Sequence, residues 1–345
     1  MNPGTVEEAQ SLLAEASKAG RKVLFVGGGT QLRPGPRPEA ELRTQKLNRL
    51  VEYAPSDQVV TAEAGMTLSA LQVELARNRQ RLAIDPPFAD RATVGGIIAA
   101  NSFGPLRTRY GSVRDLIIGI SIVRADGTLA KGGGKVVKTV AGFDLPKLMC
   151  GSYGTLGLIA TATFRVHPLP EQSVTLRARG VDPVELVRRV RTEQLEPAAM
   201  LAVDGAVYVR FEGFGAGVKQ QREKLRDLEE AAWPEAADAP VRLKVAALPT
   251  QFAQVGRALA PLQGRLEWLP TLGIGFAHAQ AADVAGIEAA RRELLALGGS
   301  LVVEKAPFEV EPFGPPPSSL RLHRAVKSQL DPQGILSPGR FVGGI

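Results

Sequence analysis

The chain has 345 residues, 44% hydrophobic and 22% charged, which is enough apolar material for two domains or one large one. It contains one cysteine, Cys150, so neither a disulfide framework nor an iron–sulfur cluster can be built from this chain's cysteines alone. The formal net charge is +7, but the arginines are spread along the chain and only 5% of residues are aromatic, which does not favour nucleic-acid binding. No apolar run reaches the roughly 20 residues that cross a bilayer, and the polar N-terminus lacks a signal-peptide pattern, so a cytoplasmic protein is predicted.

The first half of the chain predicts short strands and helices between glycine-rich loops. Residues 6–19 have the apolar spacing of a helix that ends at Gly20, and residues 22–26 form a strand that leads into three glycines. A turn at 125–128 closes a predicted hairpin of residues 120–123 against 129–130. The other predicted elements are a helix at 68–78 and strands at 47–50, 59–62, 117–123 and 155–167.

Beyond the prolines at 168 and 170, strands alternate with longer helices. Strands are predicted at 174–178, 200–203, 207–211, 266–276 and 300–304, and helices at 183–192, 219–232, 282–297 and 320–330. This order predicts an antiparallel sheet with helices on one face, and hence an α+β fold. The predicted domains are a first domain at 1–167, a cap domain at 168–318, and a C-terminal helix and tail at 319–345 that packs back on the first domain.

The segment FVGGGTQLRPG follows a strand, which is where a phosphate-binding turn is expected. It is not a Rossmann fingerprint, because the third glycine position falls on Leu32 and the following prolines forbid a helix. A Walker loop is also absent, because Val136 follows Gly134 and Lys135 where Ser or Thr is required. Consecutive glycines still allow several backbone N–H groups to converge on one phosphate.

Two further clusters rich in glycine follow, TVGGIIAAN at 93–101 and GSYGTLGLI at 151–159. The first consists mostly of small residues, so it packs closely against a flat group or forms a short buried helix. Three such loops within about 130 residues would be costly in backbone entropy if they were only turns. The three clusters therefore predict one shared anionic ligand.

Four motifs in this order carry a family resemblance: FVGGGTQLRPG, PPFADRATVGGIIAANSFGPLRTRYGSVRDLIIGI, KVVKTVAGFDLPKLMCGSYGTLGLI and GILSPGRF. The chain resembles FAD-linked oxidases of the vanillyl-alcohol oxidase and p-cresol methylhydroxylase type, and within them the FAD-binding E subunits of bacterial glycolate oxidases. The resemblance covers nearly the whole chain and is strongest over residues 20–167. It implies a two-part FAD-binding domain of the p-cresol methylhydroxylase type, followed by an α+β cap with an antiparallel sheet.

The resemblance also implies which residues hold FAD. These are Gly27, Gly28, Gly29, Thr30, Gln31 and Leu32 at the diphosphate; Pro86, Thr93, Gly95, Gly96, Asn101, Gly104, Arg107, Arg109, Tyr110 and Gly111 along the flavin; and Gly157 and Ile159 at the adenosine or the ring. Many relatives carry a histidine in the first loop that bonds to the flavin, and Gly29 and Thr30 stand there in this chain, so the FAD is predicted to be non-covalent. We expect Gly28→Val to weaken FAD binding, because a β-branched side chain cannot adopt a positive φ or let a phosphate approach.

Oxidation of a 2-hydroxy acid needs a base for the hydroxyl proton and an arginine for the carboxylate. The candidates are His278, on a predicted cap strand, and Arg340, in the tail; the alternatives are a structural histidine and an ordinary surface arginine. Catalytic relatives carry a metal motif of the form H-x-G-D-G-N-x-H in the cap, and this chain keeps only His278 of it, so no metal site is predicted. Lys138 and Asp144 are interpreted as packing residues, and Thr139 stands where relatives commonly have Asn.

Three functions stay open at this point. The first is the FAD-binding subunit of a glycolate oxidase complex that converts glycolate to glyoxylate and passes electrons to an iron–sulfur subunit, beside a second flavoprotein subunit. The second is a stand-alone FAD-dependent 2-hydroxyacid dehydrogenase, and the third is a non-catalytic assembly subunit. The missing cap motif favours the first or the third over the second.

Overall fold

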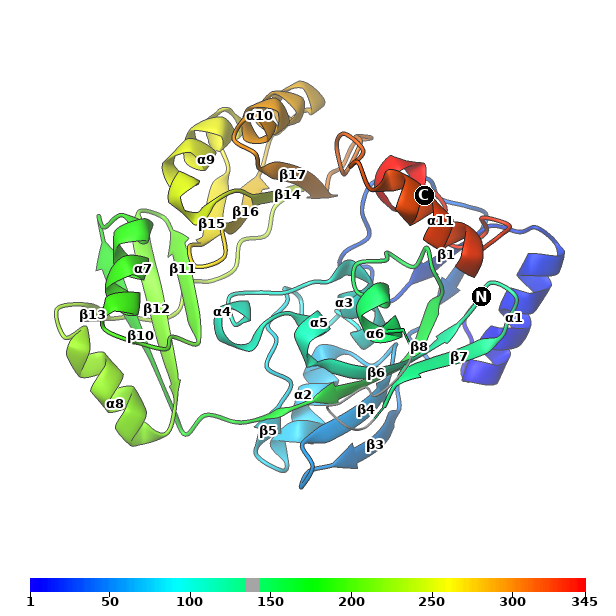
Figure 1. The fold of residues 1–345 in the computed structure, drawn as a ribbon, viewed down its shortest axis with the longest axis horizontal. Coiled ribbons are helices and arrows are strands. Elements are labelled where there is room, and N and C mark those ends of the chain that lie inside the picture. Colours follow the sequence, from blue (N-terminus) through cyan, green and yellow to red (C-terminus); the bar gives the residue numbers. More distant parts are fainter. Residues whose placement is uncertain (135–142) are drawn as a thin grey trace. The chain divides into compact units, whose positions relative to one another are not determined.

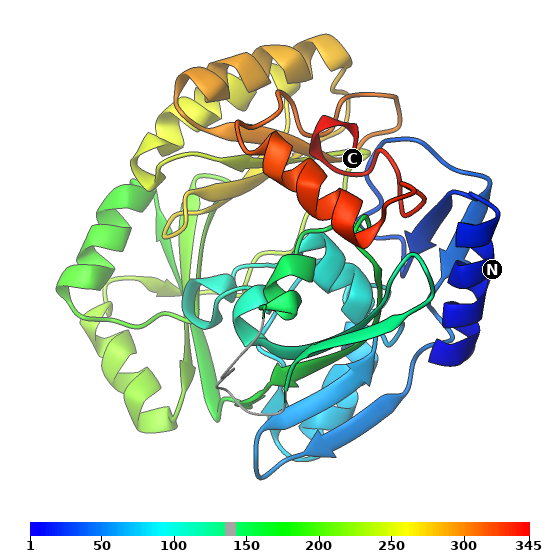
Figure 2. The same ribbon diagram turned by 45° about the vertical axis from the view of Figure 1, so that its right-hand side comes forward.

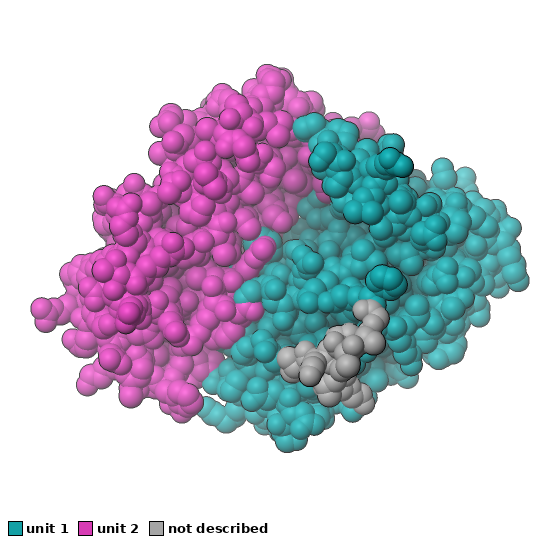
Figure 3. Space-filling model, viewed as in Figure 1, with its two compact units in different colours: residues 1–104, 111–169, 315–345 teal, residues 105–110, 170–314 magenta. Residues whose placement is uncertain are grey.

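The computed structural model describes residues 1–134 and 143–345, and these form two compact units that Figure 3 colours separately. Lys138 and Thr139 lie outside the described residues. The described parts of residues 1–104, 111–169 and 315–345 make up unit 1, and residues 105–110 and 170–314 make up unit 2. The division into domains at 1–167, 168–318 and 319–345 stays a prediction, while the compact units change at Leu169 and Gly314 and give residues 105–110 to unit 2.

A five-stranded antiparallel sheet forms the centre of unit 1 among the described residues (Figure 1). Its order is β3-β4-β8-β6-β7, with β3 at Leu50–Ala54, β4 at Val59–Glu63, β8 at Leu158–Arg165, β6 at Ile117–Val123 and β7 at Leu129–Gly133. The turn between β6 and β7 contains Gly127, and its backbone φ of 82° is one that glycine adopts without strain. The hairpin predicted from this turn is therefore confirmed.

Helices of unit 1 cover this sheet with their apolar faces. They are α2 (Leu68–Ala76), α3 (Val94–Ala100), α5 (Val113–Leu116) and α6 (Leu145–Met149), and β5 (Gln80–Arg81) pairs with β9 (His167–Pro168) beside them. Leu71, Ile98 and Leu116 from three of these helices are fully buried in one cluster with Phe164 of β8. The spacing that predicted the helix at 68–78 thus reflects the face that α2 buries.

A smaller layer of unit 1 holds the first glycine loop. Strand β1 (Val23–Val26) pairs in parallel with β2 (Ala40–Arg43), and helix α1 (Val6–Lys18) packs on them through Ala9, Leu13 and Ala16. The side chain of Thr5 caps α1 by accepting a hydrogen bond from the Glu8 N–H. The C-terminal helix α11 (Leu320–Leu330) and the short turn η3 (Val342–Gly344) also belong to unit 1 (Figure 1).

Unit 2 is built on an eight-stranded antiparallel sheet, counted over the described residues. Its order is β13-β10-β12-β11-β15-β16-β14-β17, with β13 at Glu229–Glu230, β10 at Gln172–Arg179, β12 at Ala206–Gly213, β11 at Ala199–Val203, β15 at Arg265–Leu269, β16 at Ile274–Ala279, β14 at Val241–Ala246 and β17 at Ser300–Lys305. The predicted hairpin around Asp204 and Gly205 joins β11 and β12.

Four helices lie along one face of the unit 2 sheet, as Figure 2 shows for the green to orange helices. They are α7 (Pro183–Thr192), α8 (Gly215–Lys224), α9 (Phe252–Leu259) and α10 (Val284–Ala296); η1 (Pro249–Gln251), η2 (Ala260–Leu262) and the short α4 (Arg107–Tyr110) complete the unit. Leu186, Val255 and Ile287 from three of the helices share a core with the buried Trp268 of β15. The predicted α+β class, with helices on one face of an antiparallel sheet, is confirmed.

Two predicted elements of unit 2 are wrong. The helix predicted at 219–232 starts earlier and ends at Lys224, because Asp227 forms a two-pronged pair with Arg189 and Glu229 pairs with Arg177 as part of an edge strand. The single strand predicted at 266–276 is a hairpin, because Gly273 makes a turn with a φ of 66°. Local spacing favoured regular continuation in both places, but ion pairs with distant residues decided the first case and a local turn decided the second.

Two strand boundaries in unit 1 also differ from the prediction. Residues 47–49 precede strand β3, since the Leu47 N–H bonds to the Thr44 carbonyl in a turn. Strand β8 begins at Leu158 rather than at 155, because the Thr155 N–H and hydroxyl both bond to the Ser152 carbonyl. Within the described residues, no helix is long and apolar enough to cross a membrane.

Candidate functional site

The first glycine loop packs backbone to backbone against the second glycine-rich segment. A Cβ atom on Gly27 would lie 2.2 Å from the Thr93 hydroxyl oxygen, and one on Gly28 would lie 1.7 Å from the Arg91 carbonyl oxygen. A side chain at residue 28 could not be accommodated without moving backbone, and one at residue 27 would displace the Thr93 hydroxyl. The positive φ that the sequence suggested for Gly28 belongs instead to Gly29, at 72°.

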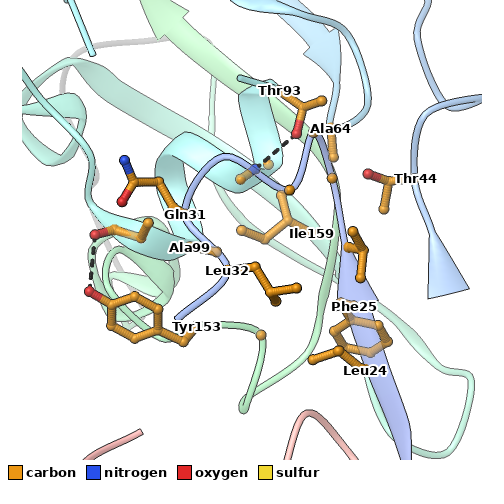
Figure 4. A pocket seen from close by; sticks show the side chains of 18 of the residues that line it. Leu24, Phe25, Gln31, Leu32, Thr44, Ala64, Thr93, Ala99, Tyr153 and Ile159 are labelled. Carbon is orange, nitrogen blue, oxygen red and sulfur yellow. Dashed lines mark hydrogen bonds between the residues drawn. The ribbon is translucent and has the colours of Figure 1, made fainter. Parts of the chain in front are cut away.

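Helix α3 brings the second cluster under the loop. Thr93 caps the helix, and its hydroxyl oxygen accepts a hydrogen bond from the Gly96 N–H at 3.3 Å, drawn as a dashed line in Figure 4. Gly95 lies so close to Ala64 that a Cβ would come within 2.7 Å of the Ala64 methyl carbon. The sequence allowed either close packing or a short buried helix here, and the structure has both.

The third cluster, residues 151–159, contributes to the same region as the glycine loop and α3. The Tyr153 hydroxyl donates to the Ala100 carbonyl at 3.3 Å at the end of α3 (Figure 4). Gly154 approaches the tail residue Ser337 and the ring of Phe25, and Gly157 packs against Ile122 and the Val123 carbonyl. Three segments separated in the sequence therefore meet around one hollow.

That hollow is a mostly apolar pocket with an open mouth. It is walled by backbone from the glycine loop and by the flat faces of small residues (Figure 4). The lining residues are Leu24, Phe25, Val26, Gly27, Gly28, Gly29, Thr30, Gln31, Leu32, Arg33, Thr44, Ala64, Thr93, Gly95, Gly96, Ala99, Ala100, Tyr153, Gly154, Gly157, Leu158, Ile159 and Arg340. All of them belong to unit 1.

The structure brings together many of the residues that the sequence nominated for FAD. Those that line the pocket are Gly27, Gly28, Gly29, Thr30, Gln31, Leu32, Thr93, Gly95, Gly96, Gly157 and Ile159, and Arg340 joins them. The sequence did not nominate the other lining residues, which are Leu24, Phe25, Val26, Arg33, Thr44, Ala64, Ala99, Ala100, Tyr153, Gly154 and Leu158. Phe25, Arg33 and Tyr153 stand within the motifs FVGGGTQLRPG and GSYGTLGLI, so those motifs were the available signal, whereas nothing local marked Thr44.

Other nominated residues of unit 1 lie outside the pocket lining. Asn101 ends helix α3 in a left-handed conformation with a φ of 47°, and a Cβ on Gly104 would lie 2.1 Å from the Asp85 carbonyl oxygen. Gly111 has a φ of 77°, and Pro86 is buried. These positions have clear local reasons for their residue types, and their contact with FAD stays a prediction.

Three nominated residues, Arg107, Arg109 and Tyr110, lie in unit 2 on α4. There Arg109 donates to the carbonyls of Glu196 and Glu212 at 3.4 and 3.3 Å, and Tyr110 packs on a small cluster that includes Ala199. These contacts fasten α4 to β11 and β12. A flavin contact for these residues stays a prediction.

The candidate base His278 is buried on the face of the unit 2 sheet opposite α7, α8, α9 and α10, with 8% of its surface exposed. Its Nε2 atom lies 3.5 Å from a carboxylate oxygen of Glu267 on the neighbouring strand. Burial raises the pKa of Glu267, but the neighbouring His278 imidazole and the hydrogen bond from the Ala237 N–H outweigh it and leave that pKa below its usual value. The imidazole therefore already has a carboxylate partner, and its role as a base stays a prediction.

The candidate Arg340 lines the pocket and is buried, with 4% of its surface exposed, so it is not an ordinary surface arginine. Its guanidinium donates to the Arg33 carbonyl and, at 2.5 Å, to the Pro36 carbonyl, and it thereby ties the tail to the segment that follows the glycine loop. Over residues 1–134 and 143–345, no three His, Cys, Asp or Glu side chains are grouped as a metal site.

The C-terminal tail extends the small parallel sheet that carries the loop. The Val23 N–H donates to the Ile335 carbonyl at 2.8 Å, and the Ser337 N–H donates to the Val23 carbonyl at 2.7 Å. The Ser337 hydroxyl accepts from the Phe25 N–H at 3.3 Å. The tail that the sequence placed against the first domain is thus a third strand-like segment beside β1.

A glycine-lined pocket between a parallel strand pair and an antiparallel sheet is the arrangement of a dinucleotide-binding oxidoreductase, and known proteins specify it further. A family model described as an FAD binding domain matches residues 1–133. Glycolate oxidase subunit GlcE of Escherichia coli (strain K12) is 33% identical over 308 residues, which are 85% of this chain and 84% of that protein. A D-lactate dehydrogenase of Archaeoglobus fulgidus is 37% identical over 172 residues, 49% of this chain and 38% of that protein.

A solved structure of alkyldihydroxyacetonephosphate synthase has the same fold, with a TM-score of 0.75 at 16% identity over 98% of this chain and 75% of that one. The chain belongs to the FAD-linked oxidases of the vanillyl-alcohol oxidase and p-cresol methylhydroxylase type. FAD is its cofactor. The pocket fits the dinucleotide, because glycines that can offer backbone amides to a diphosphate line it and, within residues 1–134 and 143–345, no acidic side chain does.

Proposed function

We propose that this chain is the FAD-binding subunit of a complex that oxidises glycolate, or a similarly small 2-hydroxy acid, to the 2-oxo acid. The similarity to glycolate oxidase subunit GlcE along 85% of the chain carries the proposal. The similarity of 49% of the chain to a D-lactate dehydrogenase supports the same substrate class, since lactate is also a 2-hydroxy acid. Bound FAD supplies the hydride acceptor for such a reaction, while the hydroxyl proton leaves to a base.

The residues of unit 1 serve this function by binding and orienting the cofactor. Residues 27–29 line the pocket with backbone because they have no side chains, and backbone amides of such a loop suit a diphosphate. Apolar side chains such as Leu24, Leu158 and Ile159 exclude water from the rest of the pocket. Electrons must then leave the flavin. Because this chain has one cysteine, the proposed acceptor is a partner subunit that carries iron–sulfur clusters. The proposed complex also contains a second flavoprotein subunit and works in the cytoplasm.

The burial of His278 against Glu267 favours keeping a second candidate, a non-catalytic assembly subunit. The two candidates and a stand-alone dehydrogenase are separated by one experiment. The chain is purified both alone and with its native partners, and flavin content and glycolate-dependent dye reduction are measured on each sample. We expect a yellow lone chain without turnover and an active complex. Turnover by the lone chain would select the stand-alone enzyme, and a complex whose activity survives removal of this chain's flavin would select the assembly role.

The attachment of FAD gives a separate prediction. The pocket is lined at Gly29 and Thr30 where covalent relatives carry a histidine, and no histidine lines it. Acid precipitation of the yellow protein is therefore expected to release all of the flavin into the supernatant, as measured by absorbance. Flavin that stays with the pellet would contradict non-covalent binding.

A further inference from the structure

The charge of the FAD pocket comes from two arginines. Among the described residues that line it, Arg33 and Arg340 are the charged ones, and no Asp or Glu is present. Both are more than nine-tenths buried, with 6% and 4% of their surfaces exposed. Two positive charges held in an apolar pocket are costly unless an anion joins them.

Arg340 is held in place by neutral groups. Two of its nitrogens donate to the carbonyls of Arg33 and Pro36, and within the described residues its Nε atom has no hydrogen-bond acceptor. Burial lowers the pKa of Arg340, the neighbouring Arg37 lowers it further, and Glu41 opposes the shift. The hydrogen bonds to the two carbonyls therefore fix the orientation of the guanidinium but do not neutralise its charge, which a bound anion could do.

The guanidinium of Arg33 stacks on a pair of aromatic rings, Tyr153 and Phe341, of which Tyr153 is in direct contact with it. Its guanidinium carbon lies 4.2 Å above the centre of the Tyr153 ring, and both side chains line the pocket. The other ring of this pair is Phe341, stacked on Tyr153 with centroids 6.1 Å apart. Since Phe341 follows Arg340 directly in the tail, one short segment fixes both arginines at the end of the glycine loop.

We propose that Arg33 and Arg340 supply the counter-charge for the diphosphate of FAD, alongside the backbone amides of residues 27–32. The diphosphate carries two negative charges, and the pair of guanidinium groups carries two positive ones. This inference rests on FAD binding in the unit 1 pocket and is independent of which hydroxy acid is oxidised.

The test is FAD binding to the apo-protein, followed by flavin fluorescence at several NaCl concentrations. Arg33→Met and Arg340→Met each remove a charge from the pocket, Arg340→Lys keeps it, and Arg37→Met removes an exposed arginine from the same segment as a matched control. We expect both pocket variants to raise the Kd by about 10- to 100-fold, as for lost hydrogen bonds to charged groups. They should also flatten the salt dependence of the Kd. Arg340→Lys should recover most of the affinity, and Arg37→Met should stay within about threefold of wild type.

Other outcomes overturn the proposal. If Arg340→Lys binds FAD as weakly as Arg340→Met, and the salt dependence is that of wild type, Arg340 is only a tie between tail and loop. If the two pocket variants match Arg37→Met, the amides suffice for the diphosphate. Circular dichroism of each apo-protein shows that the variant is folded, and Arg33→Met keeps the test open should Arg340→Met not fold. A complex without glycolate turnover would defeat the proposed function and leave these affinities unchanged.

Discussion

Gly28→Ala is expected to abolish tight FAD binding and to lower the free energy of unfolding by about 3 kcal/mol. A single methyl group suffices, because the new carbon would lie 1.7 Å from the carbonyl oxygen of Arg91, which is backbone and cannot rotate away. The loop must therefore separate from the segment that leads into Thr93 and α3. That movement displaces the amides that face the diphosphate, so we expect the Kd for FAD to rise by about 100-fold or more.

The measurements are urea unfolding of the apo-protein and FAD titration of the folded variant. Gly217→Ala in helix α8 is the matched control, since nothing lies within 4 Å of the added carbon and alanine favours a helix. The control should bind FAD like wild type and be as stable or slightly more stable. A folded Gly28→Ala protein with wild-type affinity would show that the loop does not hold the cofactor.

The sequence was most informative where local rules decide the structure. Runs of glycine after the strand at 23–26 indicated a phosphate site, and eleven of the nominated residues do line one pocket with Arg340. Helices α7 and α11 start and end at the predicted residues, and for α7 the Asp182 cap and Pro183 are local signals of its start. The cap sheet followed from hairpin turns such as the one at Gly205.

The sequence was silent where residues far apart decide the structure. Phe25 and Tyr153 wall the pocket because the tail and the third glycine cluster meet β1, and no spacing rule places residue 337 beside residue 25. The end of α8 depends on the pairing of Asp227 with Arg189 across 38 positions. For Arg340, the sequence indicated an anion partner but could not show that its side chain ties two loops together.

The second large loss of stability is expected from breaking a buried ion pair at the end of α11, between Lys327 and Asp331. Lys327 lies 2.5 Å from a carboxylate oxygen of Asp331, and it also donates to the carbonyls of Thr155 and Leu336 at 2.8 and 2.9 Å. The Asp331 side chain is fully buried and accepts the N–H groups of Ile335 and Leu336. Burial lowers the pKa of Lys327, and Asp331 opposes that shift, so the charged pair holds together in the folded state.

Lys327→Met is therefore expected to lower the free energy of unfolding by about 3–5 kcal/mol, because it leaves a buried carboxylate without its cation. Lys305→Met is the matched control, since Lys305 also pairs with an aspartate, Asp238, but both side chains are more than half exposed. That pair should contribute less than about 1 kcal/mol. Urea unfolding of both variants, without FAD, gives the comparison. If both variants lower the free energy of unfolding equally, the buried pair does not specifically connect α11 with the third glycine cluster and the strand-like tail. If only Lys327→Met loses stability, and it also releases FAD faster, then the contacts of α11 and the tail stabilise the cofactor pocket without lining it at Lys327.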